Sequence, residues 1–188
     1  MRKIEHNYQS IEGWFNMENE YLYLLDNCPD GGTFVELGCF KGKSTSFIVT
    51  EILNRKRPIE FIAVDSFEGA TDSKDSKEVQ AYKGISDIEK DFDLNTKLIS
   101  HNFSKVKSLS HEAASLFEDN SIDICFIDAG HSYEAVKKDI QSWLPKIKKG
   151  GIISGHDYNA WTGVNQAVNE IIGLPDKIVN DCWFKKVI

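Results

Sequence analysis

Acidic and imidazole side chains follow three of the apolar segments that the sequence predicts to be β-strands. Asp65 follows Glu60–Val64, Asp128 follows Ile122–Ile127, and the pair His156-Asp157 comes just after Gly151–Ser154. His131 stands three residues after Asp128. The carboxyl ends of strands in an open α/β sheet meet at one edge, so these side chains are expected to converge there. Because such groups accept protons and hydrogen bonds from a ligand, their convergence predicts a site for acid–base chemistry.

A glycine-containing loop joins the predicted strand Thr33–Leu37 to a helix that is expected to begin near Ser44. Its sequence is Glu36-Leu37-Gly38-Cys39-Phe40-Lys41-Gly42-Lys43-Ser44. Backbone N–H groups at such a strand-to-helix turn can receive a ligand. Only three residues separate Gly38 from Gly42, which is one too few for a phosphate-binding P-loop, and the G-x-G-x-x-G dinucleotide fingerprint is missing. A tight turn that merely requires glycine stays open as an alternative.

Helical patterns alternate with the strand segments, which predicts a doubly wound α/β fold with a mostly parallel sheet. The clearest helix contains Val136, Ile140 and Trp143 at helical spacing, with Ser132 placed as its N-cap. The strand before Ser110 lies at either Lys97–His101 or Lys105–Leu109, and we favour the second because a helix is expected to occupy the first.

The chain is expected to form one domain over residues 1–188, with an N-terminal helical cap segment over residues 1–30. Residues 66–84 are predicted to form a mobile substrate loop, because Ala70–Lys83 is polar and lacks a clear period. At the other end, Lys177–Val179 and Trp183–Ile188 are expected to pair as an antiparallel hairpin around Asn180-Asp181.

Composition excludes several classes of protein. There are 22 Lys and Arg against 29 Asp and Glu, a formal net charge of −7, and no basic stripe of the kind that a nucleic-acid binder uses. No window approaches the ~18 uninterrupted apolar residues that a membrane span needs. We therefore expect a cytoplasmic protein that acts on a small molecule and binds neither nucleic acid nor membrane.

The loop from Glu36 to Ser44 resembles the acid-x-G-x-x-x-G loop of class I S-adenosylmethionine-dependent methyltransferases. The resemblance implies a Rossmann-like methyltransferase fold, with a doubly wound, mostly parallel seven-stranded sheet and a C-terminal antiparallel hairpin. It also implies that Asp65 accepts hydrogen bonds from both ribose hydroxyls of S-adenosylmethionine and that Ser110 and His111 approach the adenine. The full cofactor-binding set that it implies is Glu36, Gly38, Gly42, Ser44, Asp65, Ser110, His111 and Asp128.

Two further segments, IDAGHSYE at 127–134 and KGGIISGHDY at 149–158, resemble a small bacterial group of methyltransferases. The group includes macrolide-sugar O-methyltransferases and cephalosporin hydroxylase, and the likeness covers nearly the whole chain. For the sugar enzymes it implies a divalent metal, magnesium or manganese, at Asp128, His156 and Asp157, and it makes His131 the catalytic base. His156 departs from the carboxylate that is usual there, and imidazole suits zinc or iron better than magnesium. Either His156 binds the ion, or it hydrogen-bonds substrate or backbone while the two aspartates hold the ion.

Methyl transfer to an aliphatic hydroxyl explains why a metal and a base would occur together. The hydroxyl has a pKa near that of water, ~15.7, and histidine one of ~6.5, so full proton transfer before attack would cost ~12 kcal/mol. A bound cation lowers the pKa of the hydroxyl, which leaves His131 to collect the proton as the methyl group moves. The resemblance thus implies O-methylation of a small-molecule hydroxyl, such as that of a sugar.

Other functions remain as alternatives to this interpretation. The scaffold could bind S-adenosylmethionine without turnover or carry a hydroxylase-like activity, and Gly42-Lys43-Ser44 could serve a nucleotide phosphate-binding protein. Trp14, Trp161 and Trp183 either line the acceptor pocket or belong to the core.

Overall fold

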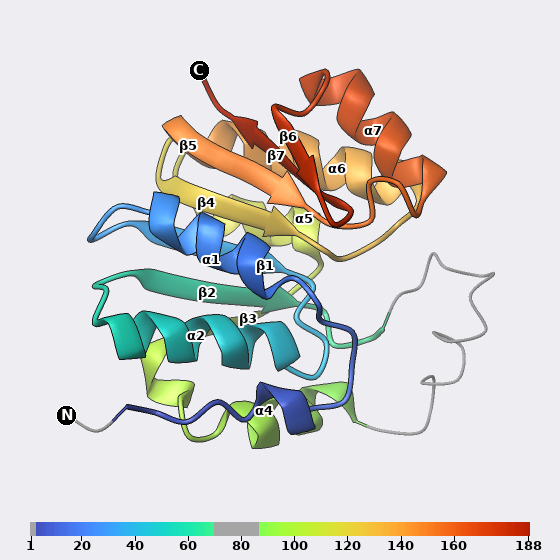
Figure 1. The fold of residues 1–188 in the computed structure, drawn as a ribbon. Coiled ribbons are helices and arrows are strands. Elements are labelled where there is room, and N and C mark those ends of the chain that lie inside the picture. Colours follow the sequence, from blue (N-terminus) through green and yellow to red (C-terminus); the bar gives the residue numbers. More distant parts are fainter. Residues whose placement is uncertain (1–2, 70–86) are drawn as a thin grey trace.

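Parallel strands in the middle of the molecule carry both layers of helices (Figure 1). The computed structural model describes residues 3–69 and 87–188. Within these ranges the sheet has seven strands in the order β3-β2-β1-β4-β5-β7-β6. The strands are β1 (Thr33–Leu37), β2 (Glu60–Asp65), β3 (Ser104–Lys107), β4 (Ile122–Ile127), β5 (Ile147–Gly155), β6 (Lys177–Val179) and β7 (Cys182–Lys186). The first five pair in parallel, whereas β7 pairs antiparallel with both β5 and β6.

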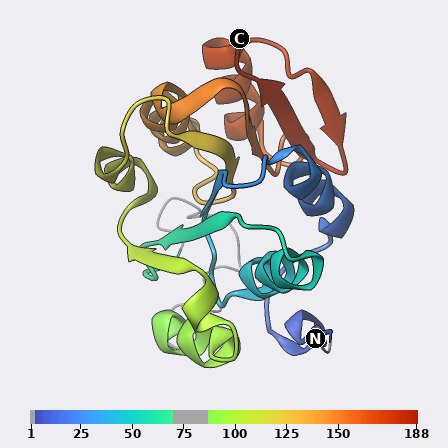
Figure 2. The same ribbon diagram turned by 90° about the vertical axis from the view of Figure 1, so that its left-hand side faces the viewer.

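Helices cover the two faces of the sheet in separate groups. The α-helices are α1 (Glu18–Asn27), α2 (Lys43–Arg55), α4 (Ile88–Thr96), α5 (Ser110–Ala113), α6 (Tyr133–Trp143) and α7 (Thr162–Ile172). Short 3-10 turns occur at η1 (Tyr8–Ser10), η2 (Ser100–Asn102), η3 (Ala114–Leu116) and η4 (Leu144–Lys146). One core joins α1, α2 and α4 to one sheet face, and a second core joins α5, α6 and α7 to the other, so the predicted doubly wound architecture is confirmed (Figures 1 and 2).

Side chains of β1 contribute to the cores on both faces of the sheet. Phe34 packs with α1 and α2, whereas Val35 and Leu37 pack with α5, α6 and α7. Because both faces are covered, the central strands are mostly apolar, as parallel strands usually are, and Glu36 in β1 and Asp123 in β4 are buried exceptions. The order in which strands join the sheet reverses at β1: β2 and β3 follow on one side of β1, and β4 then pairs in parallel on the other side. The ligand crevice of an open α/β sheet lies at this switch point.

Most of the predicted elements are confirmed with small changes in their ends. The strand before Ser110 is at Ser104–Lys107, which is the second of the two alternatives. Ser132 caps α6 by accepting a hydrogen bond from the N–H of Ala135 at 3.3 Å. The predicted C-terminal hairpin forms, and its turn residues Asn180 and Asp181 have φ of 47° and 66°, as a type I′ turn requires. The segment Ala70–Lys83, which is predicted to form a mobile loop, lies outside the described residues.

The N-terminal segment is helical over Tyr8–Ser10 and Glu18–Asn27, and extended or irregular elsewhere between residues 3 and 30. Where the structure describes the chain, each helix is too short or too polar to cross a lipid bilayer.

Candidate active site

The glycine loop after β1 adopts a backbone conformation that favours glycine at two of its positions. Gly38 has φ of 87°, and a side chain there would collide with the carbonyl oxygen of Asp128. Gly42 has φ of 85° and precedes α2, and a Cβ atom there would lie 2.8 Å from Cγ2 of Thr96. Positive φ and close packing both favour glycine at these positions. The spacing seen in the sequence therefore has a physical basis in the loop itself, which brings the end of β1 against the end of β4.

Asp65 fastens this loop to the end of β2. Its Oδ2 accepts hydrogen bonds from the N–H groups of Cys39 at 2.7 Å and Phe40 at 2.8 Å, and its Oδ1 accepts one from the N–H of Phe67 at 2.7 Å. Burial raises the pKa of Asp65, although these backbone hydrogen bonds oppose the change. A carboxylate can accept about four hydrogen bonds, and three backbone N–H groups already donate to Asp65. To accept hydrogen bonds from both ribose hydroxyls as well, Asp65 would have to release one of these three.

Glu36 in β1 is fully buried next to the glycine loop, and its carboxylate connects β1 to α1 and α2. Its Oε1 accepts a hydrogen bond from the hydroxyl of Tyr21 on α1 at 2.7 Å, and its Oε2 accepts one from Thr45 on α2 at 2.5 Å. Burial raises the pKa of Glu36, while hydrogen bonds from Ser44, Thr45 and Tyr21 act in the opposite direction. Glu36 thus connects the glycine loop and the start of α2 to α1.

Replacement of Tyr21 by phenylalanine should therefore loosen the glycine loop. Losing a hydrogen bond to a buried carboxylate is expected to lower the free energy of unfolding by about 1–3 kcal/mol and to weaken binding of S-adenosylhomocysteine. Urea unfolding and calorimetry measure the two effects. Tyr23→Phe is the matched control on the same helix, since no described residue hydrogen-bonds its hydroxyl. Equal behaviour of the two variants would show that the Tyr21–Glu36 bond does not support the loop.

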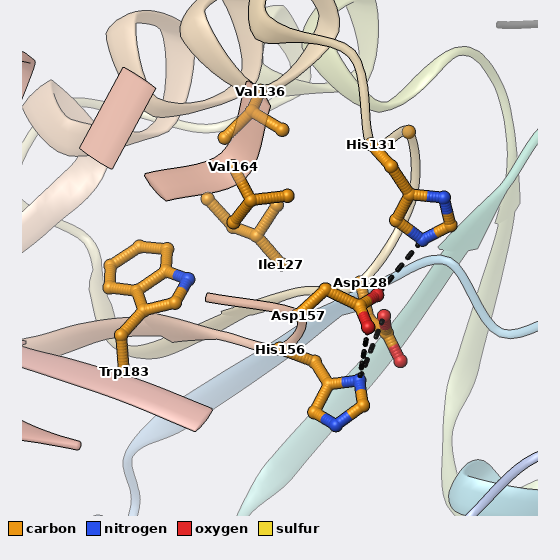
Figure 3. Close-up of a pocket in the computed structure, with 9 residues that line it drawn as sticks. Ile127, Asp128, His131, Val136, His156, Asp157, Val164 and Trp183 are labelled. Carbon is orange, nitrogen blue, oxygen red and sulfur yellow. Dashed lines mark ion pairs between the residues drawn. The ribbon is translucent and has the colours of Figure 1, made fainter. Parts of the chain in front are cut away.

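Four acid and imidazole side chains meet at the carboxyl ends of β4 and β5 (Figure 3). Nε2 of His131 lies 3.0 Å from Oδ2 of Asp157. Nδ1 of His156 lies 3.3 Å from Oδ1 of Asp157 and 3.9 Å from Oδ1 of Asp128. The predicted convergence of these residues at one rim is therefore present, with Asp157 between the two imidazoles.

Mutual charge and burial shift the acidities within this group. Burial raises the pKa of Asp128 to about 6; the charge of His156 opposes this shift and that of Asp157 adds to it. Burial also acts on Asp157, but hydrogen bonds from His131 and His156 outweigh it and hold the pKa of that carboxyl well below its usual range. For His156, burial lowers the pKa, yet the hydrogen bond to Asp157 and the nearby carboxylates raise it overall. Asp157 is therefore the firmly ionised member of the group.

A small cavity of about 10 Å³ lies beside these four side chains. Its apolar wall consists of Ile127, Val136, Val164 and Trp183. This is room for about one water molecule or a bare ion, so a cofactor and an acceptor would have to lie across the rim outside it. The ring of Trp161 stacks on His131 with centroids 4.9 Å apart, whereas Trp14 is exposed and packs against Phe40.

The structure permits two metal-ligand sets rather than one. Ligand atoms of Asp128, His131 and Asp157 all lie within 4.8 Å of one another, and His156 contacts the same two aspartates. Two carboxylates and one imidazole are a donor set that a divalent cation accepts, and among the described residues the grouping by distance favours the set with His131. The sequence predicted the set with His156. Tertiary structure adds His131 as a competing third ligand.

Ser110 and His111 begin α5 directly after β3, as the adenine-side prediction requires. The Ser110 hydroxyl, however, donates a hydrogen bond to Oδ1 of Asp139 on α6 at 2.5 Å, and the Ser110 carbonyl accepts one from Nε1 of Trp143. His111 is half-buried. The contact of these residues with adenine stays a prediction.

Sequence reasoning missed two contacts that shape the site. Tyr21 was not a candidate, because its partner Glu36 is fifteen residues away on another element. The pairing of His131 with Asp157 was also missed, since both residues were assigned separate roles. Their positions after neighbouring strands could have indicated the pairing.

The order of the strands, the glycine bend after β1 and the acidic residue at the end of β2 define a class I methyltransferase fold. A family model described as a methyltransferase domain matches residues 35–158, more than half of the chain. The chain belongs to this methyltransferase domain family.

Curated relatives are distant in sequence. The uncharacterized protein R132 of Acanthamoeba polyphaga mimivirus is 28% identical over an alignment of 165 residues, and the match covers 81% of this chain and 66% of the relative. The uncharacterized protein y4gI of Sinorhizobium fredii is 26% identical over 123 residues, or 65% of this chain and 13% of the relative. The chain thus spans less than two thirds of either protein.

Solved structures share the fold over most of the chain. The O-methyltransferase NovP has a TM-score of 0.68 at 18% identity, covering 92% of this chain and 78% of NovP. The calicheamicin methyltransferase CalS11 has a TM-score of 0.60 at 15% identity, covering 90% of this chain and 76% of CalS11. At these identities the likeness shows the architecture alone.

Proposed function

We propose that the protein transfers a methyl group from S-adenosylmethionine to a hydroxyl of a small molecule, such as a sugar, with help from a divalent metal. The observation that carries the proposal is the pairing of His131 with Asp157 beside Asp128, at the rim next to the glycine loop. NovP is named an O-methyltransferase and CalS11 a TDP-rhamnose 3'-O-methyltransferase, which supports hydroxyl chemistry on this fold.

The cofactor supplies a methyl group on a sulfonium, which is already activated for displacement. Binding is assigned to Gly38, Gly42 and Ser44 of the loop, with Glu36 below them and Asp65 beside the ribose. Ser110 and His111 are assigned to the adenine side, and Asp128 lies where the loop meets β4. The residues at the rim must orient the acceptor oxygen in line with the methyl group and remove its proton.

His131 is the proposed base. Its Nε2 lies at hydrogen-bond distance from the ionised Asp157, and the tautomer that donates this proton leaves Nδ1 as the basic nitrogen. Asp157 fixes the ring and stabilises the imidazolium that forms, in the manner of a His–Asp pair. Stacking on Trp161 holds the ring plane. The acceptor proton is therefore assigned to Nδ1 of His131 as the new carbon–oxygen bond forms and the methyl carbon–sulfur bond breaks. Nδ1 is buried, so the acceptor oxygen must enter beside the covered edge of the ring.

Asp128, His156 and Asp157 are the proposed metal ligands, which keeps His131 available as a base. A divalent ion would lower the pKa of the acceptor hydroxyl and fix its direction. The imidazole in this donor set favours zinc or iron over magnesium, while the two carboxylates also suit manganese.

Titration of the protein with S-adenosylhomocysteine and, separately, with ATP tests the cofactor assignment. We expect calorimetric binding of the homocysteine ligand and none of ATP. Methyl transfer to a panel of sugars and phenols then tests turnover. Tight binding of ATP with no response to S-adenosylhomocysteine would overturn the proposal, while cofactor binding without any methyl transfer would favour a non-catalytic or hydroxylase-like module.

Manganese affinity separates the two ligand sets. His156→Ala is expected to weaken manganese binding by about tenfold or more, because it removes one of three ligands, whereas His131→Ala should leave it within about threefold. Calorimetry of the chelator-treated protein measures both. The reverse order would make His131 a ligand instead of the base, and equal affinity of both variants with wild type would remove imidazole from the metal site.

A further inference from the structure

Glu20 is a buried carboxylate that the mechanism above does not use. It lies in the first turn of α1 and is only 4% exposed. Its Oε1 accepts a hydrogen bond from Nδ2 of Asn180 at 2.9 Å, a contact across 160 residues of sequence. Its Oε2 is also buried and has no hydrogen-bond partner among the residues that the structure describes. One oxygen of this carboxylate therefore lacks the partner that a buried acceptor normally has.

The position of Glu20 places it beside the proposed active site. Asn180 belongs to the β6–β7 turn, and β7 starts opposite the carboxyl end of β5, where Gly155 pairs with Trp183. The same turn accepts a hydrogen bond from the N–H of Tyr158 through the Asp181 carbonyl, immediately after the His156-Asp157 pair. Figure 1 shows the N-terminal end of α1 on the side of the sheet where β4 and β5 end. Glu20 thus lies at the β6–β7 turn, which in turn contacts the segment that carries His156 and Asp157.

Charge at this rim is unbalanced. Burial raises the pKa of the Cys182 thiol at the start of β7, and the charges of Glu20, Asp128, Asp157 and Asp181 act in the same direction, so Glu20 shares this region with the carboxylates of the proposed site. The imidazoles of His131 and His156 contact Asp157, not Glu20. A buried carboxylate with one neutral hydrogen bond is costly unless a cation or a strong donor completes it.

Resting on the proposed methyltransferase function, we propose that Glu20 binds a protonated amine of the acceptor, which is therefore a polyhydroxyl compound of the amino-sugar class. An ammonium group supplies the missing donor to Oε2 and offsets the negative charge of the rim. A diphosphate-linked sugar would instead bring like charges together. Because Oε2 is buried, side chains that cover it must move for the ammonium group to reach it, while Asn180 can keep its hydrogen bond to Oε1.

Matched sugars test this assignment. With S-adenosylhomocysteine present at saturation, calorimetry compares methyl β-D-glucosaminide with methyl β-D-glucoside, and the galacto pair likewise. The wild type is expected to bind at least one amino sugar about tenfold or more tightly than the matching sugar that carries a hydroxyl in place of the amine. Glu20→Gln should abolish this preference, and Asp26→Asn, which removes an exposed charge from the same helix, should retain it.

Stability distinguishes binding from a structural role. If Glu20 is kept for the ligand, Glu20→Gln should leave the free energy of unfolding unchanged or raise it, since an incompletely bonded carboxylate is removed. Should this variant not fold, Glu20→Asp provides the second test and should reduce the amine preference. Three results would overturn the inference. They are that the wild type binds both members of every sugar pair equally, that none of the sugars binds, or that the preference for the amine survives the Glu20 substitution. Absence of S-adenosylhomocysteine binding in the same titration would instead contradict the proposed function.

Discussion

Methyl transfer by the His131→Ala variant is expected to fall by about 10²- to 10⁴-fold, the range that general-base catalysis usually contributes. The imidazole lies 3.0 Å from the ionised Asp157 and stacks on Trp161, so its ring is held at the rim in one orientation. No other described imidazole contacts both of these residues. Without His131 the acceptor must lose its proton to water or to a poorly placed group.

Cofactor affinity separates a lost base from a damaged site. S-adenosylhomocysteine should bind the His131→Ala variant within about threefold of wild type, because the loop from Glu36 to Ser44 does not depend on this side chain. Single-turnover rates measure the chemical step itself. His101→Ala, which changes an exposed histidine on η2, is the matched control and should retain full activity. A His131→Ala variant that stays fully active would remove this residue from the mechanism.

Asp157→Asn is expected to lower methyl transfer by a comparable 10²- to 10⁴-fold. His131 and His156 each contact a different oxygen of the carboxylate, whereas asparagine has one acceptor oxygen and would present its NH2 group to the other imidazole. The imidazolium that forms on His131 would lose its counter-charge, and the ring could take the wrong tautomer. Asparagine keeps the local backbone, because Asp157 has φ of 62°, a conformation that Asn also tolerates.

The expected loss in Asp157→Asn should appear in the chemical step and in manganese affinity together, since the residue is assigned to both. Activity assays and metal calorimetry on one preparation measure the two quantities. Asp119→Asn serves as the control, because Asp119 is an exposed residue whose carboxylate pairs with Lys146. This variant should retain both activity and manganese affinity. Loss of metal affinity with unchanged turnover would show that the metal does not assist the reaction, and no change in either would place Asp157 outside the site.

Local patterns in the sequence determined much of the architecture. Apolar strand segments closed by Asp65, Asp128 and His156-Asp157 were sufficient to predict a doubly wound sheet with these groups at one edge. The hydrophobic period of a segment and the residue at which a strand ends depend on neighbouring residues in the sequence. Because the carboxyl ends of parallel strands lie at one edge of the sheet, these local features were enough to place the acidic groups there. The spacing of Gly38 and Gly42 likewise reflects backbone conformations that side chains disfavour.

Only the tertiary structure decided which of these groups are partners. The sequence placed His131 and Asp157 at one rim, but their hydrogen bond depends on the register of β4 against β5 and on the turn after each strand. Contacts such as Glu20 with Asn180 and Tyr21 with Glu36 join elements that are remote along the chain, and their geometry is set by helix packing over the sheet. Hydrogen bonds and ion pairs change over fractions of an ångström, whereas sequence pattern fixes only which face or end of an element a residue occupies.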